Sequence, residues 1–143
     1  LNKEQLFKPP IEREYPIGAY LMHFGECDAG WYAVISGKEM SDEIKKRVYY
    51  EAWFDTTPEL YNPPKEPLEV NEYIEAITET RNIFRDYILS LNDSDLDELV
   101  IQKSTKGEKK VSRKWIIYHL IEHEAHHRGQ MFMLIRKAGF KKK

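Results

Sequence analysis

The chain of 143 residues is poor in cysteine and has no long apolar run. Its single cysteine, Cys27, excludes an internal disulfide framework and is typical of a reducing compartment. The most apolar stretch, Ile17 to Phe24, is too short to cross a bilayer, and no signal peptide is recognisable. We therefore expect a cytoplasmic protein that does not enter a membrane.

An excess of charge of one sign is also missing, because 22 Lys and Arg residues face 24 Asp and Glu residues. One local exception is a basic stretch that contains a single acidic residue, Glu108. Its basic residues are Lys103, Lys106, Lys109, Lys110, Arg113 and Lys114. No aromatic side chain that could stack on a base occurs in this stretch before Trp115, so we interpret it as a solvated loop and expect no nucleic-acid partner.

Hydrophobic residues make up 41% of the chain and aromatic residues 13%, which suffices for one folded domain over residues 1–143. A helix is expected from Pro16 to Ser36, where proline suits the first turn and Gly37 suits the end. A shorter helix is expected from Ser41 to Phe54, with Ser41 as its N-cap. Four prolines between Thr56 and Pro67 predict a loop.

A third helix is expected from Val70 to Leu91, where apolar residues recur every three or four positions. A short hairpin is expected from Leu99 to Val111, around Lys106-Gly107-Glu108. The last helix should run from Ser112 to Ala138, before Gly139 and the lysines at 141–143.

Long helices with little strand signal predict an all-α, up-and-down, mostly antiparallel bundle. In this bundle, one apolar row of the third helix should face two leucines of the last helix. The row comprises Ile74, Ile77, Phe84 and Ile88, and the two leucines are Leu120 and Leu134.

Four of the five histidines lie between residues 119 and 127. On a helix, His123 and His127 project side by side from the otherwise apolar face and can hold one metal ion together, and His119 and His123 form a second pair with the same spacing. His23, in the first long helix, is the histidine outside this cluster and is the candidate third ligand. Three neutral nitrogens with an open position would suit zinc, nickel or iron. The alternative is a set of buried core histidines with hydrogen-bond partners.

The segment from His123 to His127 also matches the short HExxH pattern of zinc proteases, in which Glu124 would be the general base. The extended pattern fails, because Gln130 and Met133 replace its glycine and histidine. No residue after His127 is Asp, Glu, His or Cys, so a downstream third ligand is excluded. A zinc protease is therefore a remote alternative.

The run from Tyr118 to Gln130 resembles the C-terminal signature of the DinB (DNA-damage-inducible) family, and Pro16 to Glu26 is similar to that family's earlier histidine helix. The resemblance implies a four-helix bundle whose metal is held by His23, His123 and His127. Family members usually have one more helix before the His23 helix. Here only Leu1 to Tyr15 precede it, so this helix is expected to be absent or supplied by another chain.

Some relatives in this family are metal-dependent enzymes that transfer low-molecular-weight thiols or use them in isomerisation. The resemblance thus implies a thiol transferase that acts on small electrophiles. Glu26, one turn from His23, and Gln130 are candidates to orient the ligands, and the alternatives are a solvated or ion-paired Glu26 and a Gln130 amide that packs between helices. A non-catalytic stress-response protein with a structural metal is the alternative, and Cys27 as an added ligand would favour it. A small-molecule substrate and a homodimer are the expected partners.

Overall fold

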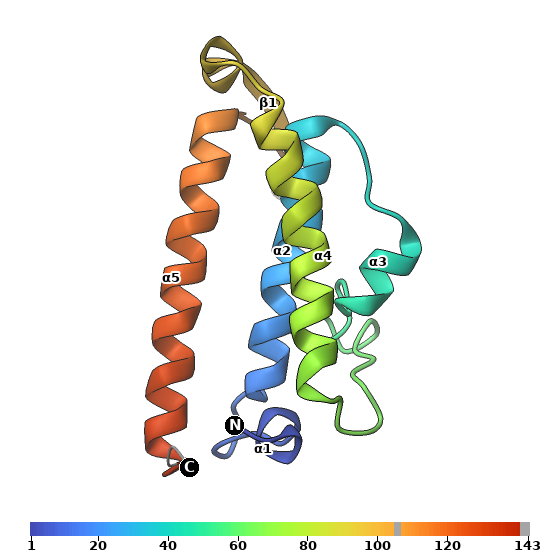
Figure 1. Ribbon diagram of the computed structural model, residues 1–143, viewed down its shortest axis with the longest axis vertical. Helices are drawn as coiled ribbons and strands as arrows, with labels where there is room; N and C mark the ends of the chain where they lie inside the picture. Colours follow the sequence, from blue (N-terminus) through green and yellow to red (C-terminus); the bar gives the residue numbers. More distant parts are fainter. Residues whose placement is uncertain (105–106, 141–143) are drawn as a thin grey trace.

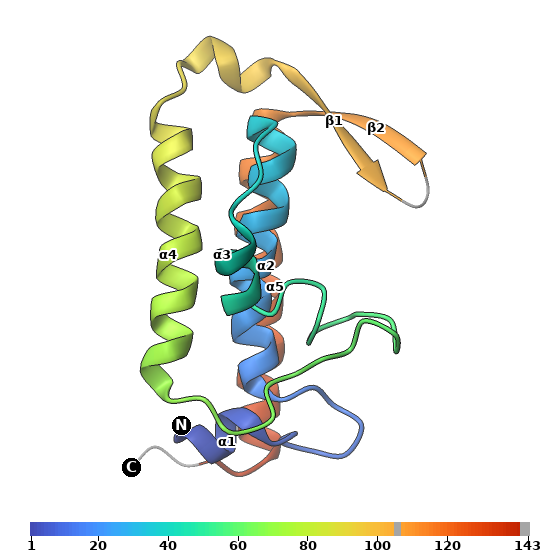
Figure 2. The same cartoon turned by 90° about the vertical axis from the view of Figure 1, so that its right-hand side faces the viewer.

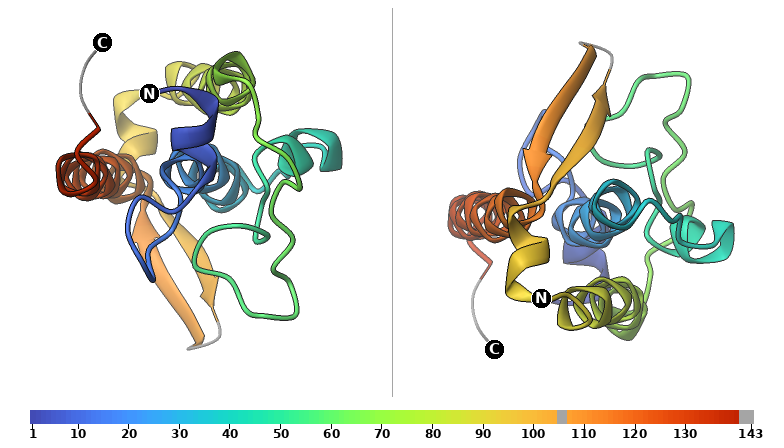
Figure 3. Two further views of the ribbon diagram at one scale, coloured as in Figure 1. Left: turned by 90° about the horizontal axis from the view of Figure 1, so that it is seen from below. Right: turned by 90° about the horizontal axis from the view of Figure 1, so that it is seen from above.

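Three long helices lie side by side along the long axis of the molecule (Figures 1 and 2). They are α2 (Ile17–Ser36), α4 (Val70–Leu89) and α5 (Arg113–Lys137). This computed structural model describes residues 1–104 and 107–140. Seen along the long axis, α2 lies between α5 on one side and the crossover segment on the other, with α4 next to it (Figure 3). The mostly helical fold agrees with the expectation from the sequence.

The long helix α2 begins after Pro16 and ends at Gly37, as the sequence predicts. Gly37 adopts a φ of 69°, a left-handed conformation that favours glycine, and its N–H donates to the carbonyl of Ala33. Buried residues occur on all sides of α2, which makes it the central helix of the molecule.

Helices α2 and α4 run in the same direction, and only α5 runs opposite to them (Figure 1). This corrects the expected up-and-down order, in which successive long helices alternate in direction. The chain leaves the top of α2 and returns to the bottom of α4 through a long crossover over residues 37–69. A connection of this length lets two neighbouring helices be parallel.

The crossover contains α3 (Asp42–Arg47), which is much shorter than the expected helix from Ser41 to Phe54. The Ser41 side chain caps it, accepting from the N–H of Ile44. Tyr49 and Glu51 then take positive φ angles of 53° and 55°, which a continuing right-handed helix cannot contain. The chain therefore turns here and directs Trp53 and Phe54 into the core.

The buried face of α4 matches the expected row only in part, with Phe84 common to both. Tyr73, Ala76, Thr80 and Phe84 are buried, whereas Ile74 is 57% exposed. Because α4 packs mainly on α2 rather than on α5, the face that it buries points toward α2. The predicted contact of Ile74 with the last helix is thus wrong.

After α4, the 3-10 helix η1 (Asp93–Asp97) leads into a hairpin of β1 (Leu99–Ser104) and β2 (Gly107–Ser112). The antiparallel register pairs Leu99 with Ser112 and Ser104 with Gly107, which confirms the expected hairpin. Helix α5 follows directly, and the Ser112 side chain caps it by accepting from the N–H of Trp115. The predicted turn residue Lys106 and the lysines at 141–143 lie outside the described residues.

The short helix α1 (Lys3–Phe7), which the sequence did not predict, closes the lower end of the bundle (Figure 3). Its Leu6 is buried against α2, at a point where Gly18 leaves no space for a larger residue. A Cβ atom at position 18 would lie 2.9 Å from the carbonyl oxygen of Leu6. Among the described residues, the segment before α2 contains one helix of five residues.

The core has two parts, one at each end of α2. The lower part surrounds Met22, Trp53 and Tyr73, and the upper part contains Ile35 and Ile116. Among the described residues, no helix combines the length and the apolar character that crossing a membrane requires.

Candidate metal centre

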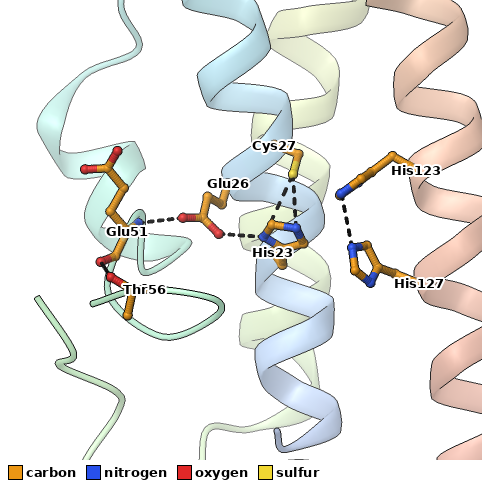
Figure 4. A network of polar contacts seen from close by, with 7 residues as sticks. All are labelled: His23, Glu26, Cys27, Glu51, Thr56, His123 and His127. Atoms are coloured by element: carbon orange, nitrogen blue, oxygen red, sulfur yellow. Dashed lines mark hydrogen bonds and ion pairs between the residues drawn. The ribbon is translucent and has the colours of Figure 1, made fainter. Parts of the chain in front are cut away.

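The three histidines singled out in the sequence meet between α2 and α5 (Figure 4). The His23 ring lies 5.1 Å from the ring of His123 and 5.0 Å from the ring of His127, measured between centroids. The Nε2 atoms of His123 and His127 are 3.1 Å apart. Two nitrogens bound to one tetrahedral zinc ion would be separated by about 3.3 Å, so this spacing is close to that of two histidines bound to the same ion.

Two of these imidazoles contact, through Nδ1, the side chain three residues further along the same helix. His23 Nδ1 lies 2.7 Å from Glu26 Oε2, and His127 Nδ1 lies 2.6 Å from Gln130 Oε1. Because both oxygens are acceptors, Nδ1 carries the proton in each ring, and Nε2 keeps its lone pair for a metal. The pattern orients the rings before any ion binds.

The crossover segment covers the site from the outer side of α2. The backbone N–H of Glu51 donates to Glu26 Oε1 over 2.6 Å, so Glu26 joins this segment to His23 (Figure 4). The Phe54 ring stacks on His23 with centroids 4.4 Å apart. Glu51 and Asp55, on either side of Phe54, have positive φ angles of 55° and 43°. Strained backbone of this kind concentrates at functional sites.

The electrostatic setting keeps the α5 imidazoles neutral. Burial, with smaller contributions from the neighbouring histidines, lowers the pKa of His123 to about 4. The pKa of His127 is also lowered, mainly by burial, although its contact with Gln130 acts in the opposite direction. A neutral imidazole is the form that binds a metal, so both residues are in the required state near neutral pH.

Cys27 lies at the same site, one turn after His23. Its Sγ atom is 3.4 Å from His23 Nε2, and ligand atoms of His23, Cys27 and His123 all lie within 4.8 Å of one another. Burial raises the pKa of the Cys27 thiol well above its ordinary value, so without a metal the sulfur carries its proton. The described residues thus bring two imidazoles and one thiol close enough for one ion, and His127 lies beside this group, with its Nε2 atom 3.1 Å from that of His123. Nitrogen and sulfur donors of this kind suit zinc and similar ions.

Comparison with known proteins agrees with this geometry. The sequence profile of the DinB family matches residues 1–143. The chain belongs to the DinB family. Protein DinB of Bacillus subtilis (strain 168) is similar to this chain, with 26% identity over 140 residues that cover 96% of this chain and 73% of that protein. Family membership confirms the resemblance inferred from the two histidine segments.

The other two histidines of this DinB-family chain lie outside the site. His119 is stacked on Trp115, with ring centroids 4.8 Å apart and planes 7° from parallel, and Trp31 contacts it edge-on. His126 is exposed at the edge of His127. Among the described residues, neither histidine belongs to the group of ligand atoms that come together at His23, Cys27 and His123.

Glu124, the would-be general base of a zinc protease, has another partner. Arg81 Nη2 of α4 donates to Glu124 Oε2 over 2.9 Å. The carboxylate is therefore engaged with α4, on a different side of α5 from the His123–His127 pair. This arrangement disfavours the protease alternative, because a general base must face the metal-bound water.

The sequence indicated Glu26 and Gln130 as orienting residues, but it contained no hint of Phe54 or of the Glu51 N–H. The signal for the first two is their common spacing, an acceptor three residues after a histidine on the same helix. Phe54 could not be found in this way, because it reaches the site only through the turn at Tyr49 and Glu51.

Proposed function

We propose that this protein binds a divalent transition metal (zinc, nickel or iron) through His23, His123 and His127. We further propose that it transfers a low-molecular-weight thiol to a small electrophile. One observation carries the proposal: the imidazoles of two helices converge, and two of them are fixed through Nδ1 by Glu26 and Gln130. Such fixed histidines are typical of metal centres.

The donor set fits such an ion, because neutral imidazoles and a soft sulfur are preferred ligands of these metals. When bound, the ion supplies Lewis acidity that lowers the pKa of a coordinated thiol. The rings of Tyr20 and Phe54, next to His127 and His23, limit the access of water. In the transfer, the thiol loses its proton to water and its sulfur bonds to the electrophilic carbon. The leaving group departs with the electrons of the broken bond.

A structural metal is the second candidate, and the position of Cys27 favours it. If its sulfur is a fourth ligand, the protein itself fills the coordination sphere and leaves no position for a substrate thiol. Catalysis would then require Cys27 to leave the ion, whereas a structural role would require it to stay. The two candidates therefore differ in what a change of Cys27 does.

The metal site is tested by elemental analysis of purified variants. We expect His123→Ala and His127→Ala to lose tight metal binding, and His126→Ala to keep it, because His126 is exposed and outside the ligand set. All three variants change a histidine of the same helix, so His126→Ala is the matched control. Equal metal content in the wild type and in a His123→Ala/His127→Ala double variant would refute the site.

Cobalt substitution and kinetics separate the two candidates. A sulfur-to-cobalt charge-transfer band that disappears in Cys27→Ser would show that Cys27 binds the ion. Thiol transfer measured with glutathione, bacillithiol and mycothiol should survive or increase in Cys27→Ser if the protein is an enzyme. Metal retained by the wild type, with no turnover for any of these thiols in either protein, would support the structural role.

A further inference from the structure

A second site lies in a groove between α4 and α5, with one residue of α2 in its wall. The groove has a volume of about 220 Å³. It is walled by apolar side chains of both helices, namely Phe84, Ile88, Leu89, Ile117, Leu120 and Ile121. Two of them, Leu89 and Ile121, are about two-thirds exposed, at 67% and 65%.

The inner wall of the groove contains a buried carboxylate, that of Asp28 on α2, which is only 1% exposed. Its Oδ2 atom accepts from Arg81 Nε over 2.7 Å. Its Oδ1 atom is equally buried and has no hydrogen-bond partner among the described residues. Arg81 does not donate to Oδ1, because the second hydrogen bond of Arg81 goes to Glu124.

A buried acceptor without a partner is costly to folding, since it has lost water and gained nothing. The candidate metal centre does not include Asp28, because the ligand atoms that come together there belong to His23, Cys27 and His123. Apolar walls around one unmatched polar group are the usual construction of a small-molecule site. The groove thus has a feature that the packing of this chain leaves unexplained.

We propose that the groove binds a small amphiphilic molecule with an N–H or O–H donor at one end. The donor pairs with Asp28 Oδ1, and a hydrocarbon or aromatic body lies along the apolar walls of α4 and α5. At Asp28 an anionic head does not fit, because the free Oδ1 atom can only accept and Arg81 already pairs with two carboxylates. Arg85, the other cation of the lining, lies 3.8 Å from the carboxylate of Asp86. Ligand sites usually measure about 300–1,000 Å³, so the occupant of this smaller groove is of fragment size.

The proposal is tested by calorimetric titration of the full chain with four probes that share one phenylbutyl body. The amine 4-phenylbutylamine and the alcohol 4-phenylbutan-1-ol carry donors, whereas the methyl ether of that alcohol and 4-phenylbutyrate do not. We expect both donor probes to bind at least about fivefold more tightly than the ether, and the carboxylate not to bind. Equal binding of the alcohol and the ether would overturn the assigned role of Asp28.

The Asp28→Asn variant separates the two kinds of donor. It should weaken the amine at least about tenfold, because a charged partner is lost, and should weaken the alcohol by less than about threefold, because an amide oxygen still accepts. Tighter binding of the amine than of the alcohol to the wild type would identify the natural head group as an ammonium. The reverse order would identify it as a hydroxyl.

Two substitutions of exposed residues on α4 test the location of the site without changing the buried core. Leu89→Lys changes an exposed wall residue and should weaken both donor probes at least about fivefold, whereas Ile74→Lys changes an equally exposed residue outside the groove and should not. Equal binding by the two variants would refute the location. If Leu89→Lys instead dissociates a dimer that Ile74→Lys leaves intact, the groove is an interface between copies of the chain, and the small-molecule proposal fails.

Discussion

At the scale of single residues, the candidate metal centre depends on side chains that are not themselves candidate ligands. Glu26 connects two parts of the site, because one of its oxygens pairs with His23 and the other accepts from the N–H of Glu51. A carboxylate behind a histidine fixes the ring and raises its basicity, and such partners contribute strongly to metal affinity.

Replacing Glu26 should therefore weaken metal binding without removing a ligand. We expect Glu26→Ala to lower the affinity about tenfold to hundredfold, as measured by competition with a chromogenic chelator. Glu26→Gln should restore most of the loss, because Gln130 already performs the same role for His127. Glu122→Gln, at an exposed position of α5, is the control. An unchanged affinity in Glu26→Ala would contradict this role.

Asp28 gives the metal-free protein a distinctive dependence on pH. Burial raises the pKa of Asp28 from 3.8 to about 6, although Arg81 acts in the opposite direction. The folded state therefore holds this proton more tightly than the unfolded state, and the stabilisation present below pH 4 is lost as the pH rises toward 6 and above. The loss should amount to about 3 kcal/mol.

This effect is measured as a difference, because His123 has the opposite sign. The lowered pKa of His123 means that the folded state resists protonation, so its contribution decreases as the pH falls below 6.5. Denaturant unfolding of the wild type and of Asp28→Asn between pH 4 and pH 7 removes the shared His123 contribution. The stability of the wild type relative to the variant should decline as the pH rises, and a flat difference would contradict the raised pKa.

Residue types predicted which histidines come together better than they predicted the partners of these histidines. Helical spacing indicated the pair His123 and His127, and His23 was the histidine outside the cluster on α5, which the family resemblance also indicated. Phe54 and Cys27 were harder. Phe54 depends on a turn with positive φ angles that no sequence pattern announced, and a lone cysteine is usually a small buried apolar residue.

At the scale of helices, small residues set the distances between elements. A Cβ atom on Gly25 of α2 would lie 2.6 Å from Val48 Cγ1 and 3.1 Å from Thr80 Oγ1. Gly25 thus allows the crossover and α4 to approach α2 together, next to Glu26. Gly129 on α5 is a helical glycine without such a neighbour, since a Cβ atom at this position would have no atom of another described element within 4 Å.

The two glycines should respond to alanine with opposite signs. Gly25→Ala should lower the free energy of unfolding by about 1–2 kcal/mol, because overpacking outweighs the gain in helix propensity. In the single chain, Gly129→Ala should raise it by up to about 1 kcal/mol, because within one copy only the helix propensity changes. Thermal and denaturant unfolding measure both. Stabilisation by Gly25→Ala would show that α2 is less tightly packed than described.

Helix ends were predictable where proline, serine or glycine marks them, as at Pro16, Gly37 and Ser112. The orientation of α4 was not, because its apolar pattern is compatible with more than one buried face. Tertiary packing on α2 selected the face with Tyr73 and Phe84 and left Ile74 in solvent. The length of α3 was mispredicted for a similar reason, since burial of Trp53 outweighed helical continuity.

At the scale of the whole molecule, α5 is partnered on one side only. Its outer face carries an exposed row at helical spacing, which consists of Tyr118, Ile121, Ala125, Gly129 and Phe132. Tyr118 and Phe132 are 64% and 60% exposed. Such a continuous apolar row on one helix is typical of an interface.

The homodimer expected from the sequence stays a prediction, and this row is where we place it. Two copies of α5 could pack closely across Ala125 and Gly129, since neither has a large side chain. Light scattering at micromolar concentration should then show a dimer, and Phe132→Glu should yield a monomer. A monomeric wild type would exclude the dimer, and a dimeric Phe132→Glu would place the interface elsewhere.

The parallel course of α2 and α4, which requires the long crossover, has a further consequence for the stability of the folded chain. His23 and His123 belong to helices separated by the crossover, α4 and the hairpin, and α5 has little contact with α4. An ion held by both residues would act as a cross-link that closes this long loop. In the loop-entropy treatment of cross-links, a closure of this length is worth about 4–5 kcal/mol, comparable to a disulfide. The metal would then stabilise the fold as a disulfide does, in a protein whose single cysteine cannot form a disulfide within the chain.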